Sequence, residues 1–265
     1  MVVNAIRCRG YSYLMREHVM TTEQCSGQRR EFLKRAGGVM LVAGMGAGAA
    51  QVFAQSRIKL GPKDALIVVD VQNCFIPGGS LAVTKGDEIV PLINTLAKSF
   101  QNVVLTQDWH TPDHVSFASS HPGKKPFEST KLAYGKQMLW PDHCVQGTEG
   151  ANLHKDLAIP TAQLIIRKGY HKDVDSYSAF VEADGKTKTG LDGYLKGRGI
   201  NSVYVCGLAT DFCVAWTALD ARKLGFAATV IEDACRGIDA QGSLAAAWDS
   251  MKKAGVKRIQ SAALA

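Results

Sequence analysis

Short apolar runs alternate with amphipathic helical patterns along most of this 265-residue chain, and this alternation limits the possible folds. Nearly continuous apolar runs are typical of strands buried on both faces, as in a parallel sheet covered by helices. The sequence therefore predicts an α/β fold of three layers, α/β/α, around a mostly parallel sheet of about six strands. The expected strands are 65–70, 102–108, 163–169, 202–208, 227–233 and 257–262, and the expected helices are 87–100, 189–199, 212–225 and 241–254. The segment 109–160 lacks the alternation and is expected to form loops over one end of the sheet.

The first 54 residues have a different character. Arg29 and Arg30 precede a weakly apolar run rich in Gly and Ala, which ends in small residues at Ala54. This pattern predicts a Tat-type signal peptide over 1–54, with Met20 as an alternative start, followed by one folded domain over 55–265. We expect a periplasmic protein without stable membrane association after cleavage. The alternative is a basic tail on a cytoplasmic protein.

The positive charge of the chain lies mostly in this leader. Residues 1–54 hold seven Lys/Arg and three Asp/Glu, so +4 of the total formal charge of +7 belongs to them. A domain with only the remaining +3 and no basic stripe is not expected to bind nucleic acid. A small molecule is the expected partner, and self-association into a homo-oligomer is left open.

Four residues with reactive side chains lie at or just after the ends of predicted strands. Asp70, Asp108 and Lys168 end the first three, and Cys213 follows the fourth. Ligands bind outside the carboxyl ends of the strands in parallel sheets. These four residues therefore predict one site.

Cys213 is the candidate nucleophile. Thr210 or Asp211 could cap the helix that it begins, and the helix N-terminus together with Lys168 is expected to lower the pKa of its thiol. Asp70 could take up the thiol proton and return it to a leaving group.

Two backbone groups could stabilise an oxyanion at the same place. The N–H groups of Ala209 and Cys213 are expected to point toward the reacting carbonyl. The combined pattern indicates acyl transfer through a thioester.

A second pattern indicates a metal site. Asp108 and His110 are two residues apart in an extended segment and can face one ion, and His143 from the long loop can complete the set. Two His and one carboxylate suit Zn, Fe or Mn, so one divalent ion is expected. His114 and His121 are expected to have exposed loop roles.

The cysteines do not predict a disulfide framework. The domain holds Cys74, Cys144, Cys206, Cys213 and Cys235, an odd and sparse set. At least one free thiol is expected, and Cys206 is expected to be core.

Several stretches together resemble bacterial nicotinamidases, of the isochorismatase-like hydrolase superfamily. They are 69-VDVQNCF-75, 107-QDWH-110, 140-WPDHCVQGTEGA-151, 167-RKG-169, 175-DSYSAF-180 and 207-GLATDFCV-214. The resemblance runs in order over nearly all of 64–262 and implies the isochorismatase-like hydrolase fold.

The resemblance also implies roles. Asp70, Lys168 and Cys213 would be the catalytic residues, and Ser116 would hold the family's variable fourth metal position beside Asp108, His110 and His143. The aromatic walls of the substrate pocket would be Phe75, Trp140 and Tyr177, and a cis peptide bond would precede Ala209. The implied reaction is hydrolysis of nicotinamide, and also of pyrazinamide, with the ring nitrogen on the metal.

Parts of this pattern are compatible with other functions. The nearest is another hydrolase of the same superfamily, an isochorismatase or an amidase for carbamoyl compounds. More distant ones are a metal-dependent oxidoreductase and a non-catalytic binder of aromatic amides, but neither explains Asp70 and Lys168 beside the thiol of Cys213.

Overall fold

The computed structural model describes residues 57–265, so the predicted leader lies outside the described residues. The main sheet has six strands in the order β5-β2-β1-β6-β7-β8, and every neighbouring pair is parallel. Its strands are β1 (Asp64–Val69), β2 (Asn102–Asp108), β5 (Leu164–Lys168), β6 (Ser202–Leu208), β7 (Ala227–Arg236) and β8 (Lys257–Ile259). The six predicted strands are all present.

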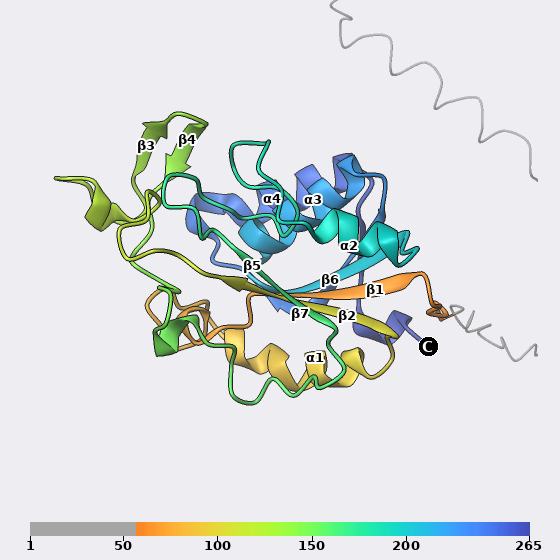
Figure 1. The fold of residues 1–265 in the computed structure, drawn as a ribbon. Helices are drawn as coiled ribbons and strands as arrows, with labels where there is room; N and C mark the ends of the chain where they lie inside the picture. Colours follow the sequence, from red (N-terminus) through yellow and green to blue (C-terminus); the bar gives the residue numbers. More distant parts are fainter. Residues whose placement is uncertain (1–56) are drawn as a thin grey trace, which may run out of the picture. The chain divides into compact units, whose positions relative to one another are not determined.

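Within residues 57–265, four α-helices cover the two faces of the sheet, so that the fold has three layers. They are α1 (Val90–Ala97), α2 (Leu191–Gly197), α3 (Ala215–Lys223) and α4 (Ser243–Lys253). Figure 1 shows α1 on one face of the sheet and the other three helices on the opposite face. The predicted α/β/α architecture is confirmed. No helix in residues 57–265 combines the length and apolar character that a membrane crossing requires.

The central strands have the burial that parallel strands require. In β1 every residue from Ala65 to Val69 is buried, and β2 is buried along its whole length. Both faces of these strands are covered by apolar side chains, so their sequences read as continuous apolar runs.

The strand order places the site. The chain builds β1, β2 and β5 outward in one direction and then returns to add β6 on the other side of β1. Side chains after the carboxyl ends of β1 and β6 therefore flank the point where the direction of winding reverses, which is the usual ligand site of such sheets. Asp70, Asp108, Lys168 and Cys213 follow or end four adjacent strands at this edge.

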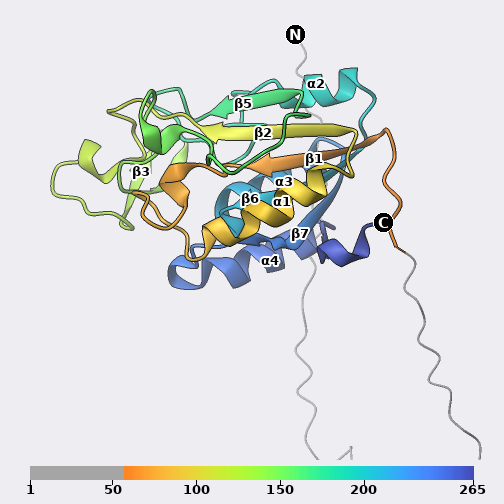
Figure 2. The same ribbon diagram turned by 90° about the horizontal axis from the view of Figure 1, so that it is seen from below.

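The long segment after β2 contains one hairpin that was not predicted. It consists of β3 (Ser129–Leu132) and β4 (Gly135–Met138), paired antiparallel. Figures 1 and 2 both place it beyond the carboxyl ends of the main strands. The loop region predicted for 109–160 does lie at this end of the sheet, but it carries this additional strand pair.

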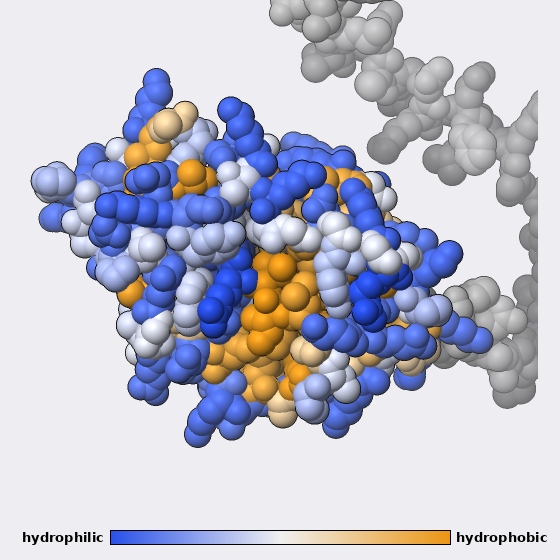
Figure 3. Space-filling model, in the orientation of Figure 1, coloured by the Kyte–Doolittle hydropathy of each residue, from blue (hydrophilic) through white to orange (hydrophobic). Residues whose placement is uncertain are grey.

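Strand β5 forms one edge of the sheet, and its residues alternate between two environments. Ile166 and Lys168 are buried, whereas Ile165 is 49% exposed and Arg167 is exposed, with its guanidinium over the Trp109 ring. Figure 3 shows an apolar strip in the part of the surface where β5 lies in Figure 1. The alternation directs Lys168 into the molecule, toward the strand ends.

Candidate active site

Lys168 lies at the centre of the site. Its ammonium donates hydrogen bonds to Asp108 Oδ1, to the carbonyl of Ser176 at 2.9 Å and to Cys213 Sγ at 3.4 Å. These three bonds account for all three ammonium protons. Asp70 Oδ2 is 2.8 Å from the same nitrogen as an ion pair and has no hydrogen-bond partner among the described residues. This carboxylate oxygen is therefore free to receive a proton.

Asp70 is held rigidly in spite of its free oxygen. The hydroxyl of Thr106 donates to Asp70 Oδ1 at 2.5 Å and accepts the N–H of Asp70 at 3.1 Å. The backbone of Asp70 has a positive φ of 49°, which is uncommon for a residue other than glycine. The candidate ligand atoms of Asp70, Asp108 and Cys213 all lie within 4.8 Å of one another. The residues at three predicted strand ends and Cys213 thus form one cluster.

Burial and charge shift the proton affinities in this cluster. Burial raises the pKa of Asp70, an effect that Lys168 opposes and Asp108 reinforces. Burial also acts to raise the pKa of Asp108, but Lys168 and His110 outweigh it and hold that pKa well below its usual range. For Lys168, burial is outweighed by the carboxylates of Asp108 and Asp70, so its pKa is raised.

The prediction that the pKa of Cys213 is lowered was wrong. Burial raises the pKa of this thiol well above its ordinary value, and Lys168 only partly offsets the effect. The resting side chain is therefore a thiol. A nucleophilic thiolate requires that its proton move to a nearby base, and Asp70 Oδ2 is available for it.

The predicted helix cap was also wrong. Cys213 lies in a π-helical turn, Thr210–Val214, that leads directly into α3 and has no side-chain cap. The Asp211 carboxylate instead accepts hydrogen bonds from the N–H groups of Ile238 and Asp239 and from the Ser243 hydroxyl. Asp211 thus ties the nucleophile's turn to the loop before α4.

The peptide bond between Leu208 and Ala209 is cis, as the resemblance implied. Ala209 is the residue before the π-helical turn, and it lines the same cavity as Cys213. Both proposed oxyanion donors are thus within one short segment.

The predicted metal ligands lie together beside the thiol. Asp108 Oδ2 is 3.5 Å from His110 Nε2 and 3.8 Å from His143 Nε2. Ligands bound to one tetrahedral zinc ion at the usual bond lengths are about 3.4 Å apart, so this spacing fits a shared ion. Each His uses Nδ1 to bond a backbone carbonyl, of Gly169 and of Pro141 respectively, both at 2.8 Å. This arrangement leaves both Nε2 lone pairs for the ion.

His114 is buried, so the expectation of an exposed role was wrong. Its Nε2 lies 3.1 Å from the carbonyl of His171, and its Nδ1 lies 2.8 Å from Ser116 Oγ. Burial, together with His110, lowers the pKa of His114 to about 4, so the ring is neutral. Because Nε2 then carries the proton, Nδ1 accepts the Ser116 hydroxyl proton. His121 is half-buried, with Nε2 near the carbonyl of Val115 at 2.8 Å.

A cavity beside Cys213 is lined by all three predicted aromatic residues, Phe75, Trp140 and Tyr177. Trp140 Nε1 donates to the Tyr177 hydroxyl at 3.0 Å, and the Phe75 ring packs on that of His143 with centroids 5.5 Å apart. The other lining residues are Leu81, Asp108, His143, Asp175, Ala209, Phe212, Cys213 and Ile238. Cys213 and two of the three candidate metal ligands, Asp108 and His143, therefore open onto one aromatic cavity.

The family model described as isochorismatase domain matches residues 64–263. The chain belongs to the isochorismatase family. A nicotinamidase of Acinetobacter baylyi is 60% identical over 205 residues, which cover 77% of this chain and 96% of that relative.

Two solved structures of nicotinamidases or pyrazinamidases are also similar to this chain. A nicotinamidase and pyrazinamidase of Acinetobacter baumannii is 65% identical with a TM-score of 0.76, covering 77% of this chain and 99% of that one. A pyrazinamidase of Pyrococcus horikoshii in complex with zinc is 38% identical with a TM-score of 0.61, covering 75% and 99%. The isochorismatase-like hydrolase fold is thus confirmed.

Some residues that shape this isochorismatase-family site were not predicted individually. Gln72 is buried. Its side-chain amide accepts a hydrogen bond from the N–H of Asp108 at 2.8 Å and donates one to the carbonyl of Asp108 at 2.9 Å. Gln137 from β4 donates to Asp175 Oδ2 at 2.6 Å and to the Tyr177 hydroxyl at 2.9 Å. Gln72 lies within the motif 69-VDVQNCF-75, whereas nothing in the sequence pattern indicated a role for Gln137.

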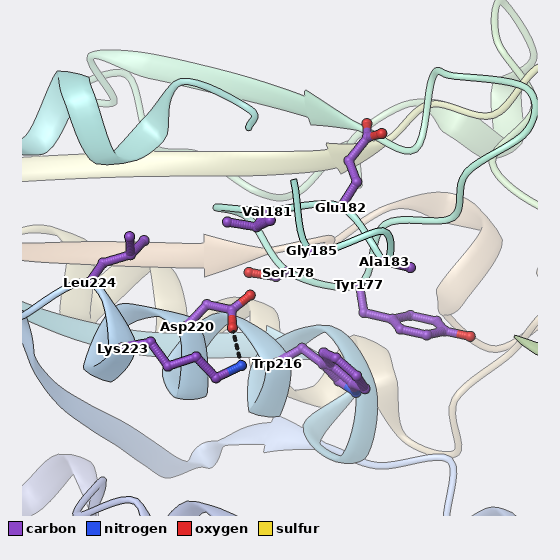
Figure 4. A pocket seen from close by; sticks show the side chains of 10 residues that line it. All are labelled: Tyr177, Ser178, Val181, Glu182, Ala183, Gly185, Trp216, Asp220, Lys223 and Leu224. Carbon is purple, nitrogen blue, oxygen red and sulfur yellow. Dashed lines mark hydrogen bonds and ion pairs between the residues drawn. The ribbon is translucent and has the colours of Figure 1, made fainter. Parts of the chain in front are cut away.

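Tyr177 also lines a second, larger groove. This groove lies between the loop 176–185 and α3, and Figure 4 shows Tyr177 and Trp216 at one end of it. The two rings are 5.7 Å apart, and Trp216 is 43% exposed. Tyr177 therefore lines both the cavity at Cys213 and this surface groove.

The first prediction concerns the buried charges. Lys168→Met should lower the free energy of unfolding at neutral pH by about 3–5 kcal/mol, because it leaves Asp70 and Asp108 buried without their cation. The difference in stability between wild type and variant should become smaller as the pH falls. In the variant, loss of the cation raises the pKa of the buried carboxyl groups, and their protonation removes the uncompensated charge. Urea unfolding at several pH values measures this. Arg167→Met, which removes the exposed cation next to Lys168, is the control. Equal stability of the two variants would contradict the stabilising role of Lys168.

Proposed function

We propose that this protein is a nicotinamidase, which hydrolyses nicotinamide to nicotinate and ammonia. One observation carries the proposal: the buried cluster of Asp70, Lys168 and Cys213 opens onto the same aromatic cavity as Asp108 and His143. The 60% identity to a nicotinamidase over nearly that enzyme's full length supports the same substrate.

The first half of the reaction forms a thioester. Asp70 Oδ2 takes the proton of the Cys213 thiol, and Lys168 stabilises the resulting thiolate at 3.4 Å. Sulfur attacks the carboxamide carbon, and the N–H groups of Ala209 and Cys213 stabilise the oxyanion. Asp70 then gives its proton to the departing nitrogen, so that ammonia leaves.

The second half releases the acid. A water molecule attacks the thioester carbon while Asp70 takes one of its protons. The bond from carbon to sulfur breaks, nicotinate forms and Cys213 recovers its proton. The raised pKa of Asp70 suits a group that must accept and return a proton in both halves.

The residues at the site fit one divalent metal ion, with Zn, Fe and Mn all compatible with the donor set. Asp108, His110 and His143 would hold it, and Ser116 is the proposed fourth position. Bound there, the ion would anchor the pyridine nitrogen and withdraw electron density from the ring. Asp108 also has a second role, because its Oδ1 accepts a hydrogen bond from the Lys168 ammonium.

The aromatic cavity would select a flat ring. Phe75, Trp140 and Tyr177 line the cavity, and the hydrogen bonds from Trp140 and Gln137 fix the Tyr177 hydroxyl. A pyrazine carboxamide has the same shape and a ring nitrogen in the same position, so pyrazinamide is proposed as a second substrate. An isochorismatase or a carbamoyl amidase remains the alternative if neither ring is hydrolysed.

The second prediction tests the nucleophile. The wild type should release ammonia from nicotinamide and from pyrazinamide, and Cys213→Ala should lower kcat at least about 1,000-fold on both because no thioester can form. Cys206→Ala, which removes another buried thiol, should retain activity. An active Cys213→Ala enzyme would point to chemistry at the metal site alone.

The third prediction tests the metal. Chelation should abolish most nicotinamide turnover, and adding back Zn, Fe or Mn should restore it. The His143→Ala variant should bind zinc more weakly than the wild type. Its Cys213 thiol should still react with a small alkylating reagent as in the wild type, because Cys213 is unchanged. Full activity in a protein shown to be metal-free would contradict the proposed site.

Export remains part of the proposal. The twin arginines and the cut expected after Ala54 support a periplasmic enzyme that acts on scavenged nicotinamide. The disulfide formed by Cys74 and Cys144 supports the same location, because disulfides persist mainly in oxidising compartments.

The fourth prediction follows from export. Cells producing the full chain should contain a periplasmic product that begins at Gln55, identified by N-terminal sequencing after fractionation. Replacing Arg29 and Arg30 by Lys should retain the protein in the cytoplasm. An uncleaved wild-type product found in the cytoplasm would instead favour the basic-tail alternative.

A further inference from the structure

We propose that the Cys74–Cys144 disulfide is a positioning element for the metal site, and that tight binding of the metal ion depends on it. The inference rests on the proposed function, since it takes Asp108, His110 and His143 as the metal ligands. The sequence predicted no such bond, because five cysteines in the domain gave no framework pattern.

Each cysteine of this pair is the direct neighbour of a site residue. Cys74 precedes Phe75 in the turn Asn73–Phe75 that follows β1, and Cys144 follows His143. The Phe75 and His143 rings pack on each other with centroids 5.5 Å apart. The disulfide thus joins covalently the two segments whose side chains meet in the cavity.

The backbone of Cys144 also reaches the second histidine. Its carbonyl accepts the N–H of His110 at 3.1 Å, and the carbonyl of His110 accepts the N–H of Gln146 at 2.8 Å. Cys144 itself has a positive φ of 46°, a conformation that a residue with a side chain keeps only where its surroundings enforce it. The disulfide and the hydrogen bond from His110 are two of the contacts that hold it.

The segment around His143 pairs with its surroundings through isolated β-bridges, Trp140 with Phe117 and Val145 with His110. Within the described residues, 139–163 contain neither a strand of the sheet nor an α-helix, apart from one short 3-10 turn, Glu149–Ala151. The disulfide ties this segment to the turn after β1, 70 residues earlier in the chain. Both cysteines are only 1% exposed, so the bond lies inside the protein. Without it, the backbone that carries His143 has greater freedom to move.

The expected effect is on metal affinity. Groups that orient metal ligands typically change affinity by about 10–100-fold when they are removed. The double variant Cys74→Ala/Cys144→Ala should therefore bind zinc about 10–100-fold more weakly than the wild type. Removing both thiols avoids leaving a single cysteine that could itself bind zinc.

The experiment uses the full chain, stripped of metal and titrated with zinc against a chromophoric chelator. Peptide mapping of the wild type by mass spectrometry first tests for the linked Cys74 and Cys144 peptides. Cys206→Ala is the matched control, because Cys206 is a buried cysteine of β6 without a disulfide, and its zinc affinity should equal that of the wild type. Circular dichroism compares the folds.

A second arm avoids substitutions in case the double variant does not fold. A water-soluble phosphine supplies two electrons and is itself oxidised to the phosphine oxide with oxygen from water, while the S–S bond becomes two thiols. Because the bond is buried, reduction is carried out in urea, and thiol titration confirms two new thiols before the urea and the phosphine are removed without air. The refolded, reduced wild type should show the same loss of zinc affinity, with wild type taken through urea without phosphine as the control.

The outcomes separate this inference from the proposed function. Wild-type peptides with both cysteines as free thiols, or unchanged zinc affinity after loss of the bond, would overturn the inference even if nicotinamide is hydrolysed. A wild type that fails to hydrolyse nicotinamide but binds zinc in a disulfide-dependent way would refute the function and leave the inference standing.

Discussion

The buried ammonium of Lys168 is the interaction on which the rest of the site depends. Two carboxylates and a thiol lie around it at the end of the sheet, where water is excluded and an isolated charge is costly. One cation among these groups allows Asp70 to stay close to Cys213 and allows Asp108 to face His110 and His143. The proposed proton acceptor and the proposed metal site are therefore joined through a single side chain.

The sheet makes this arrangement possible. Parallel strands bring their carboxyl ends to one edge, and β5, β2, β1 and β6 are consecutive neighbours there. Lys168 and Asp108 are paired directly across β5 and β2, so their side chains start from adjacent positions. Glycine at position 169 is required next to them, since a Cβ there would lie 2.5 Å from an atom of the His110 ring. Close packing at the strand ends thus sets the geometry of both halves of the site.

Most of the fold and the main site residues could be predicted from the sequence, because both depend on local patterns. Apolar runs mark strands, and reactive residues at their ends must converge once the strands are parallel. The role of Asp211 could not be predicted in this way, because its partners Ile238, Asp239 and Ser243 are distant in sequence. The burial of His114 and the pairing of Cys74 with Cys144 depend likewise on how irregular segments fold. The prediction that the pKa of Cys213 is lowered was wrong because the sequence indicates a nearby cation but not how deeply the thiol is buried.

Tyr177 is shared by two cavities. It lines the cavity beside Cys213 and also the groove along α3, where its ring lies 5.7 Å from that of the exposed Trp216. Changes on that exterior surface can therefore alter the shape of the substrate cavity through a single ring, without touching the buried charges. In evolutionary terms, selectivity for the ring of the amide and the machinery that cleaves it can vary independently.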